Sequence, residues 1–107
     1  MKPSLSSSSI KRAVQSPLKF STKKILFKYT GSDSPGLVFS LSTRLGSAVE
    51  RNLFKRRARF FLREKINKKI IIFVQPKKQL KKIKNPLNHF KLFSEFLNKE
   101  NGKNDRY

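Results

Sequence analysis

The chain has 107 residues, of which 26 are lysine or arginine and only 6 are acidic, and its net charge of +20 indicates a polyanionic partner. Because it has no cysteine and one histidine, disulfides, thiolate metal sites and the usual zinc-ligand sets are excluded. Its 36% of hydrophobic residues, including ten phenylalanines, suffices for a single domain with one modest core, so general disorder is not expected.

The predicted elements begin after a polar lead, residues 1–8, which we expect to be flexible. Ile10, Ala13 and Val14 lie on one side of a short amphipathic helix that Pro17 ends. The serine-rich, basic and acid-free start is also typical of an organellar transit peptide. The helical pattern resumes at once and an apolar signal core is absent, which disfavours a targeting peptide. The cysteine-free composition fits a reducing cytoplasm, where we expect the protein.

Two strands are predicted next. From Lys23 the side chains alternate, with Phe27 and Tyr29 on one face, and residues 31–36, GSDSPG, form a turn. Residues 37–43, LVFSLST, alternate as well. We therefore expect a second strand that pairs antiparallel with the first.

A long basic helix is predicted after the second strand. Ser47 and Glu50 have the spacing of a capping box, so the helix is expected to begin near Ala48. It should end near Asn67, where a different pattern starts. Residues 51–65 contain seven lysines and arginines, and five of the eight arginines of the chain lie among them.

This helix has a basic face, because six residues fall within an arc of about 140° at 100° per residue. They are Arg51, Asn52, Lys55, Arg56, Arg59 and Arg63. Like charges stacked four residues apart repel each other until an anion binds, and guanidinium groups pair in a fork with phosphate oxygens. The pattern therefore indicates a phosphate backbone as the ligand, and the plainer alternative is a solvated face without a dedicated partner.

Two apolar groups lie beside the basic face. Phe54, Ala58 and Phe61 form a stripe on the opposite half of the helix, which is expected to meet the sheet. A second strip borders the basic face, and contact with a neighbouring element is its simplest explanation. Its members are Val49, Leu53 and Phe60.

The C-terminal third is predicted to contain one strand and one helix. Residues 70–76, IIIFVQP, form a continuously apolar strand that suits a central position in a sheet, and their apolar run is too short to span a membrane. Residues 77–84 are expected to form a solvated basic connector. The last helix is expected to have Asn85 as its cap, Pro86 as its first residue and Gly102 as its end. Its buried stripe is predicted to comprise Phe90, Phe93, Phe96 and Leu97.

No catalytic residue or metal site is predicted for the protein alone. The six acidic residues are scattered at positions 33, 50, 64, 95, 100 and 105, whereas metal-assisted cleavage of a phosphodiester needs clustered carboxylates. His89 lies beside Phe90 in the last helix and is interpreted as a bystander. No small-molecule cofactor is expected either.

Residues 46–59, GSAVERNLFKRRAR, resemble the signature of the protein subunit of bacterial ribonuclease P. That signature has a glycine, an Ala-Val step, Arg-Asn, Lys-Arg and a final arginine. The matching residues are Gly46, Ala48, Val49, Arg51, Asn52, Lys55, Arg56 and Arg59. The resemblance extends from Ile10 to Leu97 and includes the strands on both sides of the helix.

The chain departs from the family pattern at three places. Leu53 stands where the family often has a third arginine, which weakens one expected RNA contact. Phe60 stands where an acid or amide commonly follows the last arginine. The N-terminal segment is shorter and has Ile10 and Val14 where relatives tend to have phenylalanines.

The resemblance implies a single α/β sandwich over residues 9–100, followed by a flexible tail, 101–107. Such a fold has about four strands in a mixed sheet, three helices and a left-handed βαβ crossover. The protein would assist a catalytic RNA in removing the 5′ leader from precursor tRNA, with ribonuclease P RNA and precursor tRNA as its partners. Mg²⁺ would be held mainly by the RNA. The basic face would contact the RNA subunit, and the sheet and first helix would form a cleft for the leader.

Aromatic side chains can stack on the bases of a single-stranded leader. By position and chemistry, the candidates in this chain are Phe20, Lys23, Phe27 and Tyr29, although core packing is the alternative for the three rings. A second function class stays open, namely a non-catalytic RNA-binding protein such as a small ribosomal protein. A DNA-binding helix-turn-helix fits less well, because strands and not a partner helix flank the basic helix.

Overall fold

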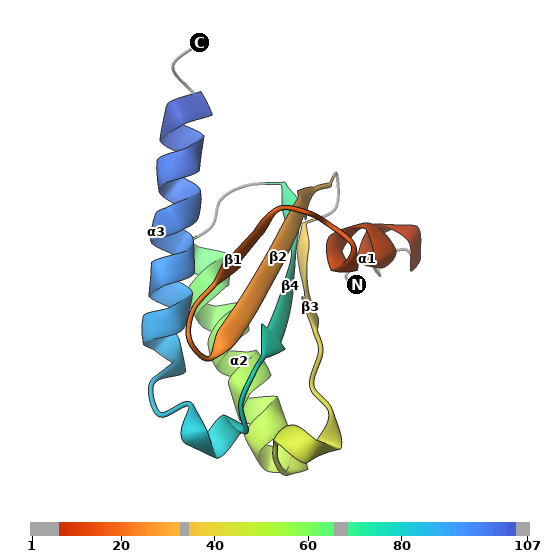
Figure 1. The fold of residues 1–107 in the computed structure, drawn as a ribbon, viewed down its shortest axis with the longest axis vertical. Helices are drawn as coiled ribbons and strands as arrows, with labels where there is room; N and C mark the ends of the chain where they lie inside the picture. Colours follow the sequence, from red (N-terminus) through yellow and green to blue (C-terminus); the bar gives the residue numbers. More distant parts are fainter. Residues whose placement is uncertain (1–6, 33–34, 66–68, 105–107) are drawn as a thin grey trace.

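A four-stranded sheet forms the centre of the protein in the computed structural model, which describes residues 7–32, 35–65 and 69–104 (Figure 1). The strand order is β1-β2-β4-β3, with β1 at Lys19–Ser21, β2 at Ile25–Gly31, β3 at Gly36–Phe39 and β4 at Ile70–Pro76. The helices are α1 (Ser7–Val14), α2 (Ala48–Lys65) and α3 (Pro86–Asn104), with short 3-10 turns η1 (Thr43–Leu45) and η2 (Leu80–Lys82). The predicted single domain, with a mixed sheet and three helices, is confirmed.

The pairing of β3 differs from the prediction. Strand β3 runs parallel to β4, and the neighbours of β2 are β1 and β4, both antiparallel to it. The expected antiparallel hairpin between residues 23–30 and 37–43 is therefore wrong. The reason lies in β4, where Ile71, Ile72, Phe73 and Val74 are all at most 7% exposed. A strand that is apolar on both faces is buried best in the middle of a sheet, so β4 inserts between β2 and β3.

The connection from β3 to β4 is a left-handed crossover. In Figure 1 both strands run downward, the chain returns upward through α2 behind the sheet, and β4 lies to the left of β3. Nearly all such connections are right-handed, so composition and periodicity alone would have predicted the other hand. The resemblance to the ribonuclease P protein implied this geometry, and the structure confirms it.

The main core lies between the sheet and the layer formed by α2 and α3. Ile25, Phe27 and Tyr29 of β2 point into it, and the Phe27 ring stacks on Phe93 of α3 with 4.3 Å between centroids. From α2 it receives the predicted Phe54 and Ala58, together with Leu62; Phe61 is half-buried against it. The predicted stripe of α3 is confirmed, with Phe90, Phe93 and Leu97 buried and Phe96 half-buried.

Helix α1 covers part of the other sheet face. Ala13 is fully buried there against Ile71 and Phe73 of β4. Ser16, which follows the helix, donates a hydrogen bond of 2.6 Å to the carbonyl oxygen of Tyr29 and holds the chain against β2. The sheet thus lies between two unequal layers, and its α1 face is only partly covered.

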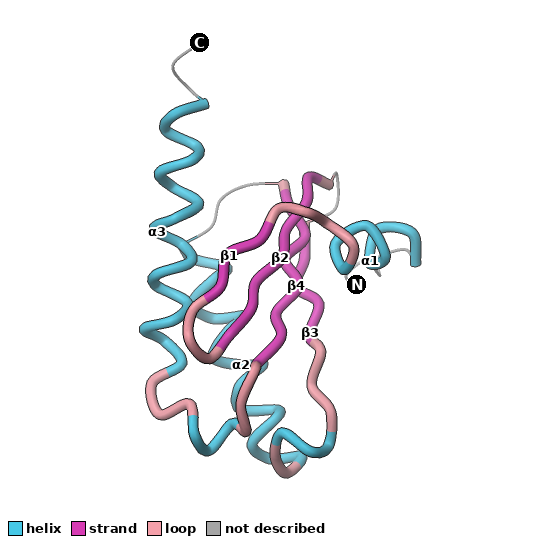
Figure 2. Tube along the Cα trace, in the orientation of Figure 1, coloured by secondary structure: helices cyan, strands magenta, loops and turns pink. Residues whose placement is uncertain are grey.

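Several predicted boundaries shift. Helix α1 begins at Ser7, inside the expected flexible lead, and α3 continues past Gly102 to Asn104, so that glycine does not end it. The predicted end of α2 at Asn67 lies outside the described residues. The connector, residues 77–84, is not fully solvated, because Leu80 and Ile83 are buried in the main core. Figure 2 shows how this connector and the β3–α2 loop meet at one end of the sheet.

Candidate nucleic-acid interface

The N-terminus of α2 is built by the predicted capping box. The Ser47 hydroxyl accepts a hydrogen bond from the Glu50 amide at 3.1 Å, and the Glu50 carboxylate accepts one from the Ser47 amide at 2.8 Å. Gly46 allows this arrangement, because a Cβ atom there would lie 2.8 Å from Oε1 of Glu50. The backbone of Gly46 is extended, so its requirement is steric and not conformational. The cap sets where the basic face begins.

The basic face lies outside the core, as its angular position predicted. Asn52, Arg56, Arg59 and Arg63 are exposed, while Arg51 and Lys55 are half-buried. Phe54 and Ala58 are buried as predicted, and the buried Leu62 falls between Arg51 and Lys55 around the helix axis, which is why these two cations are half-buried. The contact of these six residues with RNA stays a prediction.

Two arginines of the basic face are held in place by the β3–α2 region. The Arg51 Nε donates a hydrogen bond of 3.2 Å to the carbonyl oxygen of Gly46. The guanidinium of Arg59 lies 5.6 Å from the centre of the Phe39 ring, which is within cation–π range. Phe39 is at the end of β3, so this contact places the basic face along the β3 edge of the sheet. Such anchoring reduces the side-chain freedom that phosphate binding would otherwise remove.

Two of the four predicted leader contacts are contradicted by burial. Phe27 is fully buried and Tyr29 is 6% exposed, and both rings face α3 in the main core. The alternative of core packing is therefore correct for them. Phe20 is half-buried and stacks on Phe96 with 4.7 Å between ring centroids, whereas Lys23 is exposed in the turn between β1 and β2.

The sheet face beside α1 presents the alternate residues of the same strands. Register pairs Lys28 with Phe73 and Leu26 with Gln75, so these side chains point away from the main core. Phe73 is 7% exposed and the other three are half-buried. Nζ of Lys28 donates a hydrogen bond of 3.0 Å to the carbonyl oxygen of Val14 and lies 5.8 Å from the centre of the Phe73 ring. Leu26 and Lys28 are the sequence neighbours of the predicted candidate Phe27. They lie on this face because side chains alternate between the two faces of a strand.

His89 belongs to a polar cluster at the β1–β2 turn. Its Nδ1 lies 2.7 Å from Oγ1 of Thr22. Burial, and then the charge of Lys24, lower the pKa of His89 below its ordinary value of 6.5. Lys24 in turn donates a hydrogen bond of 2.7 Å to the carbonyl oxygen of Lys82. These contacts join the turn to η2 and α3 and give His89 a structural role, which fits its interpretation as a bystander to catalysis.

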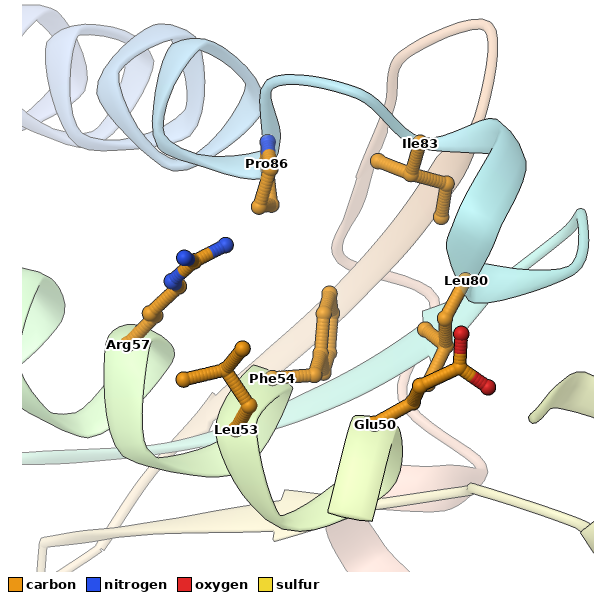
Figure 3. Close-up of a pocket in the computed structure, with 7 residues that line it drawn as sticks. All are labelled: Glu50, Leu53, Phe54, Arg57, Leu80, Ile83 and Pro86. Atoms are coloured by element: carbon orange, nitrogen blue, oxygen red, sulfur yellow. The ribbon is translucent and has the colours of Figure 1, made fainter. Parts of the chain in front are cut away.

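A small open notch of about 140 Å³ lies between α2 and the segment that leads into α3 (Figure 3). Phe54 and Leu53 form its floor, and the Arg57 side chain extends across it towards Pro86. The remaining lining residues are Glu50, Leu80 and Ile83. The notch adjoins the core side of α2 and does not contain the basic face.

Among the described residues, no three histidine or acidic side chains come together in a group that could hold a metal ion. No described helix is both long and apolar enough to cross a membrane.

Solved bacterial ribonuclease P proteins share the fold of this chain. The protein from Thermotoga maritima, in complex with 1-(4-fluorophenyl)-2-thiourea, has a TM-score of 0.62 at 21% identity, over 84% of this chain and 89% of that one. The protein from Staphylococcus aureus has a TM-score of 0.61 at 18% identity, over 88% of this chain and 95% of that one. The model of the Ribonuclease P family matches residues 5–99, and the chain belongs to this family. Among curated protein sequences, no relative matches the chain.

Proposed function

We propose that this protein is the protein subunit of ribonuclease P and binds the catalytic RNA through the basic face of α2. The observation that carries the proposal is the segregation on this helix: Arg56, Arg59 and Arg63 are exposed on one side, while Phe54, Ala58 and Leu62 are buried on another. Arg51, Arg56 and Arg59 pair with phosphate oxygens, and the exposed Asn52 offers both a donor and an acceptor to a sugar or base edge.

The partly covered sheet face beside α1 is the proposed site for the 5′ leader of precursor tRNA. It combines a cation, Lys28, with the amide of Gln75 and the apolar side chain of Leu26, and all three are half-buried. Positive charge attracts the phosphates of a single-stranded leader, and the amide offers hydrogen bonds to its bases. Leu26, Lys28 and Gln75 therefore replace Phe27 and Tyr29 as leader candidates, with Phe20 and Lys23 at the neighbouring edge.

The RNA performs the hydrolysis of the phosphodiester in this proposal, and the complex acts as an endonuclease in the cytoplasm. The described residues of the protein offer no set of ligands for Mg²⁺, so we assign the magnesium ions mainly to the RNA. No catalytic step is assigned to a protein side chain.

Reconstitution tests the proposal. A bacterial ribonuclease P RNA is incubated with precursor tRNA at limiting Mg²⁺, with and without the purified protein. We expect cleavage at the 5′ end of the mature tRNA to rise when the protein is added, and the RNA-free protein to cleave nothing. A protein that binds ribosomal RNA but leaves this cleavage unchanged supports the alternative of a non-catalytic RNA-binding protein.

A further inference from the structure

Phe60 is the most exposed phenylalanine of the chain. All ten phenylalanines lie within the described residues, and the other nine are buried or half-buried, whereas Phe60 is 69% exposed. Its ring lies on the side of α2 opposite Ala58 and Leu62, so it adds nothing to the core. Single exposed apolar side chains are common on proteins, and the surroundings of Phe60 therefore decide its meaning.

Those surroundings are basic on one side. Arg56 precedes Phe60 by four residues and Arg63 follows it by three, and both are exposed members of the basic face. Residues at these helical spacings have Cβ atoms about 5–6 Å apart. In the sequence, three arginines, at positions 56, 57 and 63, and one acid, Glu64, lie three or four positions from Phe60, so the local charge is positive. Val49 and Leu53 continue the apolar strip along the helix and are 76% and 37% exposed.

We propose that Phe60 stacks on an unpaired base of the RNA that the basic face binds, with Arg56 and Arg63 contacting adjacent phosphates. This subsite rests on the proposed function, since the RNA in question is ribonuclease P RNA. A nucleotide brings a phosphate and an aromatic base on one unit, and the spacing of a guanidinium and a ring along one helix turn accommodates both. Because every base has a π face, the subsite tolerates any base that is not already paired.

A second copy of the chain could also cover the strip of Val49, Leu53 and Phe60, but electrostatic repulsion opposes that pairing. Each copy carries +20, and pairing through this strip would bring two basic faces together. An unpaired nucleotide offers apolar contact and charge neutralisation at once. The strip is thus part of the RNA-binding surface and not an uncovered piece of core.

The first test compares Phe60→Ala with Leu92→Ala, because Leu92 is an exposed apolar residue on another helix, α3. Affinity for ribonuclease P RNA is measured over a series of salt concentrations. Phe60→Ala should weaken binding roughly 5- to 150-fold without changing the salt slope, since stacking releases no counterions. Arg56→Ala should reduce the slope by about 1. Leu92→Ala should behave like the wild type.

A second test uses the absence of tryptophan from the chain. Phe60→Trp introduces a single tryptophan, which can be excited selectively above the absorption of the two tyrosines. Its emission should be quenched by ribonuclease P RNA and not by inorganic polyphosphate, which has phosphates but no bases. Equal quenching by polyphosphate, or no quenching by an RNA that binds, would overturn the stacking subsite. So would a dimer of the wild-type protein that Phe60→Ala converts to a monomer in sedimentation.

The two proposals fail in different ways. If the wild-type protein does not bind ribonuclease P RNA, the proposed function fails. If it binds and Arg56→Ala weakens binding while Phe60→Ala and Phe60→Trp leave affinity and emission unaltered, only the Phe60 subsite fails.

Discussion

Neighbouring residues of α2 have opposite roles because each step along a helix turns by 100°. Arg56 and Phe54 are two positions apart and therefore lie about 160° apart around the helix axis. Phe54 is 4% exposed and makes edge contacts with Phe90 and Phe39, with ring centroids 5.5 and 6.3 Å away, while Arg56 is exposed. At this scale, core packing and the proposed RNA binding are separable by single substitutions.

Replacing Phe54 should therefore affect stability, and replacing Arg56 should affect activity. We expect Phe54→Ala to lower the free energy of unfolding by roughly 3 to 5 kcal/mol, since it removes a buried ring and leaves a cavity. Arg56→Ala should keep the wild-type melting temperature and lower cleavage by the reconstituted enzyme at limiting Mg²⁺. Thermal melts and cleavage assays on both variants check this. An early melt for Arg56→Ala, with an unaltered melt for Phe54→Ala, would mean that α2 is turned the other way.

His89 makes stability depend on pH. Its pKa is lowered in the folded protein by burial and by Lys24, so the unfolded chain binds the proton more readily. The free energy of unfolding should therefore rise with pH from the lowered pKa up to about 6.5 and be constant above it. Denaturant melts between pH 5 and 8 measure this, with His89→Gln as the non-titrating control. If the free energy of unfolding depends on pH in the same way in the wild type and in His89→Gln, His89 is not the group that causes this dependence.

At the scale of elements, helix positions were the most predictable part of the fold. The Ser47–Glu50 pair marked the start of α2, and the periodicity of Phe54 and Ala58 marked its buried side, because both signals are local in sequence. Strand pairing depends on which segments are buried together. The partner of β3 was mispredicted for that reason: β4 follows it only after a long helix.

The same limit affected the candidate leader site. The sequence shows that β2 alternates but not which of its two faces meets the α2–α3 layer, so it leaves Phe27 and Tyr29 open as leader candidates or core residues. The structure assigns that face to the core, because α3 supplies Phe90 and Phe93 to pack on it. Exposure of Phe60 was likewise not predictable, since an apolar residue beside a basic face can pack against a neighbour or remain in solvent.

The alternative sheet face leads to a prediction about the leader. Gln75→Glu adds a negative charge to that face with almost no change in shape, and Gln75 is only half-buried, so the fold should tolerate it. We expect the reconstituted enzyme to bind leader-bearing precursor tRNA more weakly, while its affinity for mature tRNA is unchanged. Gln79→Glu on the connector is the matched control, because Gln79 is exposed and lies outside this face. Equal losses for both tRNAs would place the leader elsewhere.

The N-terminal cap of α2 should be sensitive to a single added methyl group at Gly46. A Cβ atom on Gly46 would lie 2.8 Å from Oε1 and 3.3 Å from Cβ of Glu50, so Gly46→Ala should displace the capping carboxylate. The expected loss is about 1 kcal/mol, the size of a lost cap. Urea melts should show a smaller effect of Gly46→Ala in a Glu50→Ala background, where no carboxylate remains to displace. Fully additive losses would show that the alanine disturbs something other than the cap.

At the scale of the whole molecule, the net positive charge opposes folding and favours the proposed binding of RNA. The protein measures 45 × 28 × 25 Å and carries +20. At 10 mM salt the Debye length is about 30 Å, so each charge repels most of the others, whereas at 150 mM it is about 8 Å and only neighbours interact. Electrostatic self-repulsion therefore destabilises the free protein, and either added salt or a bound polyanion reduces this repulsion.

Salt should accordingly change stability and RNA affinity in opposite directions. The melting temperature of the free protein should rise between 10 and 150 mM salt, because screening reduces self-repulsion in the compact state. If about five phosphates are contacted, affinity for ribonuclease P RNA should fall by on the order of several hundredfold between 50 and 200 mM salt. The reason is that binding releases counterions from the RNA, and their release is less favourable in a more concentrated salt solution. Melting curves and binding titrations on the same preparations measure both trends. A melting temperature that falls with salt would contradict the self-repulsion of the free protein. An affinity that hardly changes with salt would mean that the basic face of α2 is only a solvated surface.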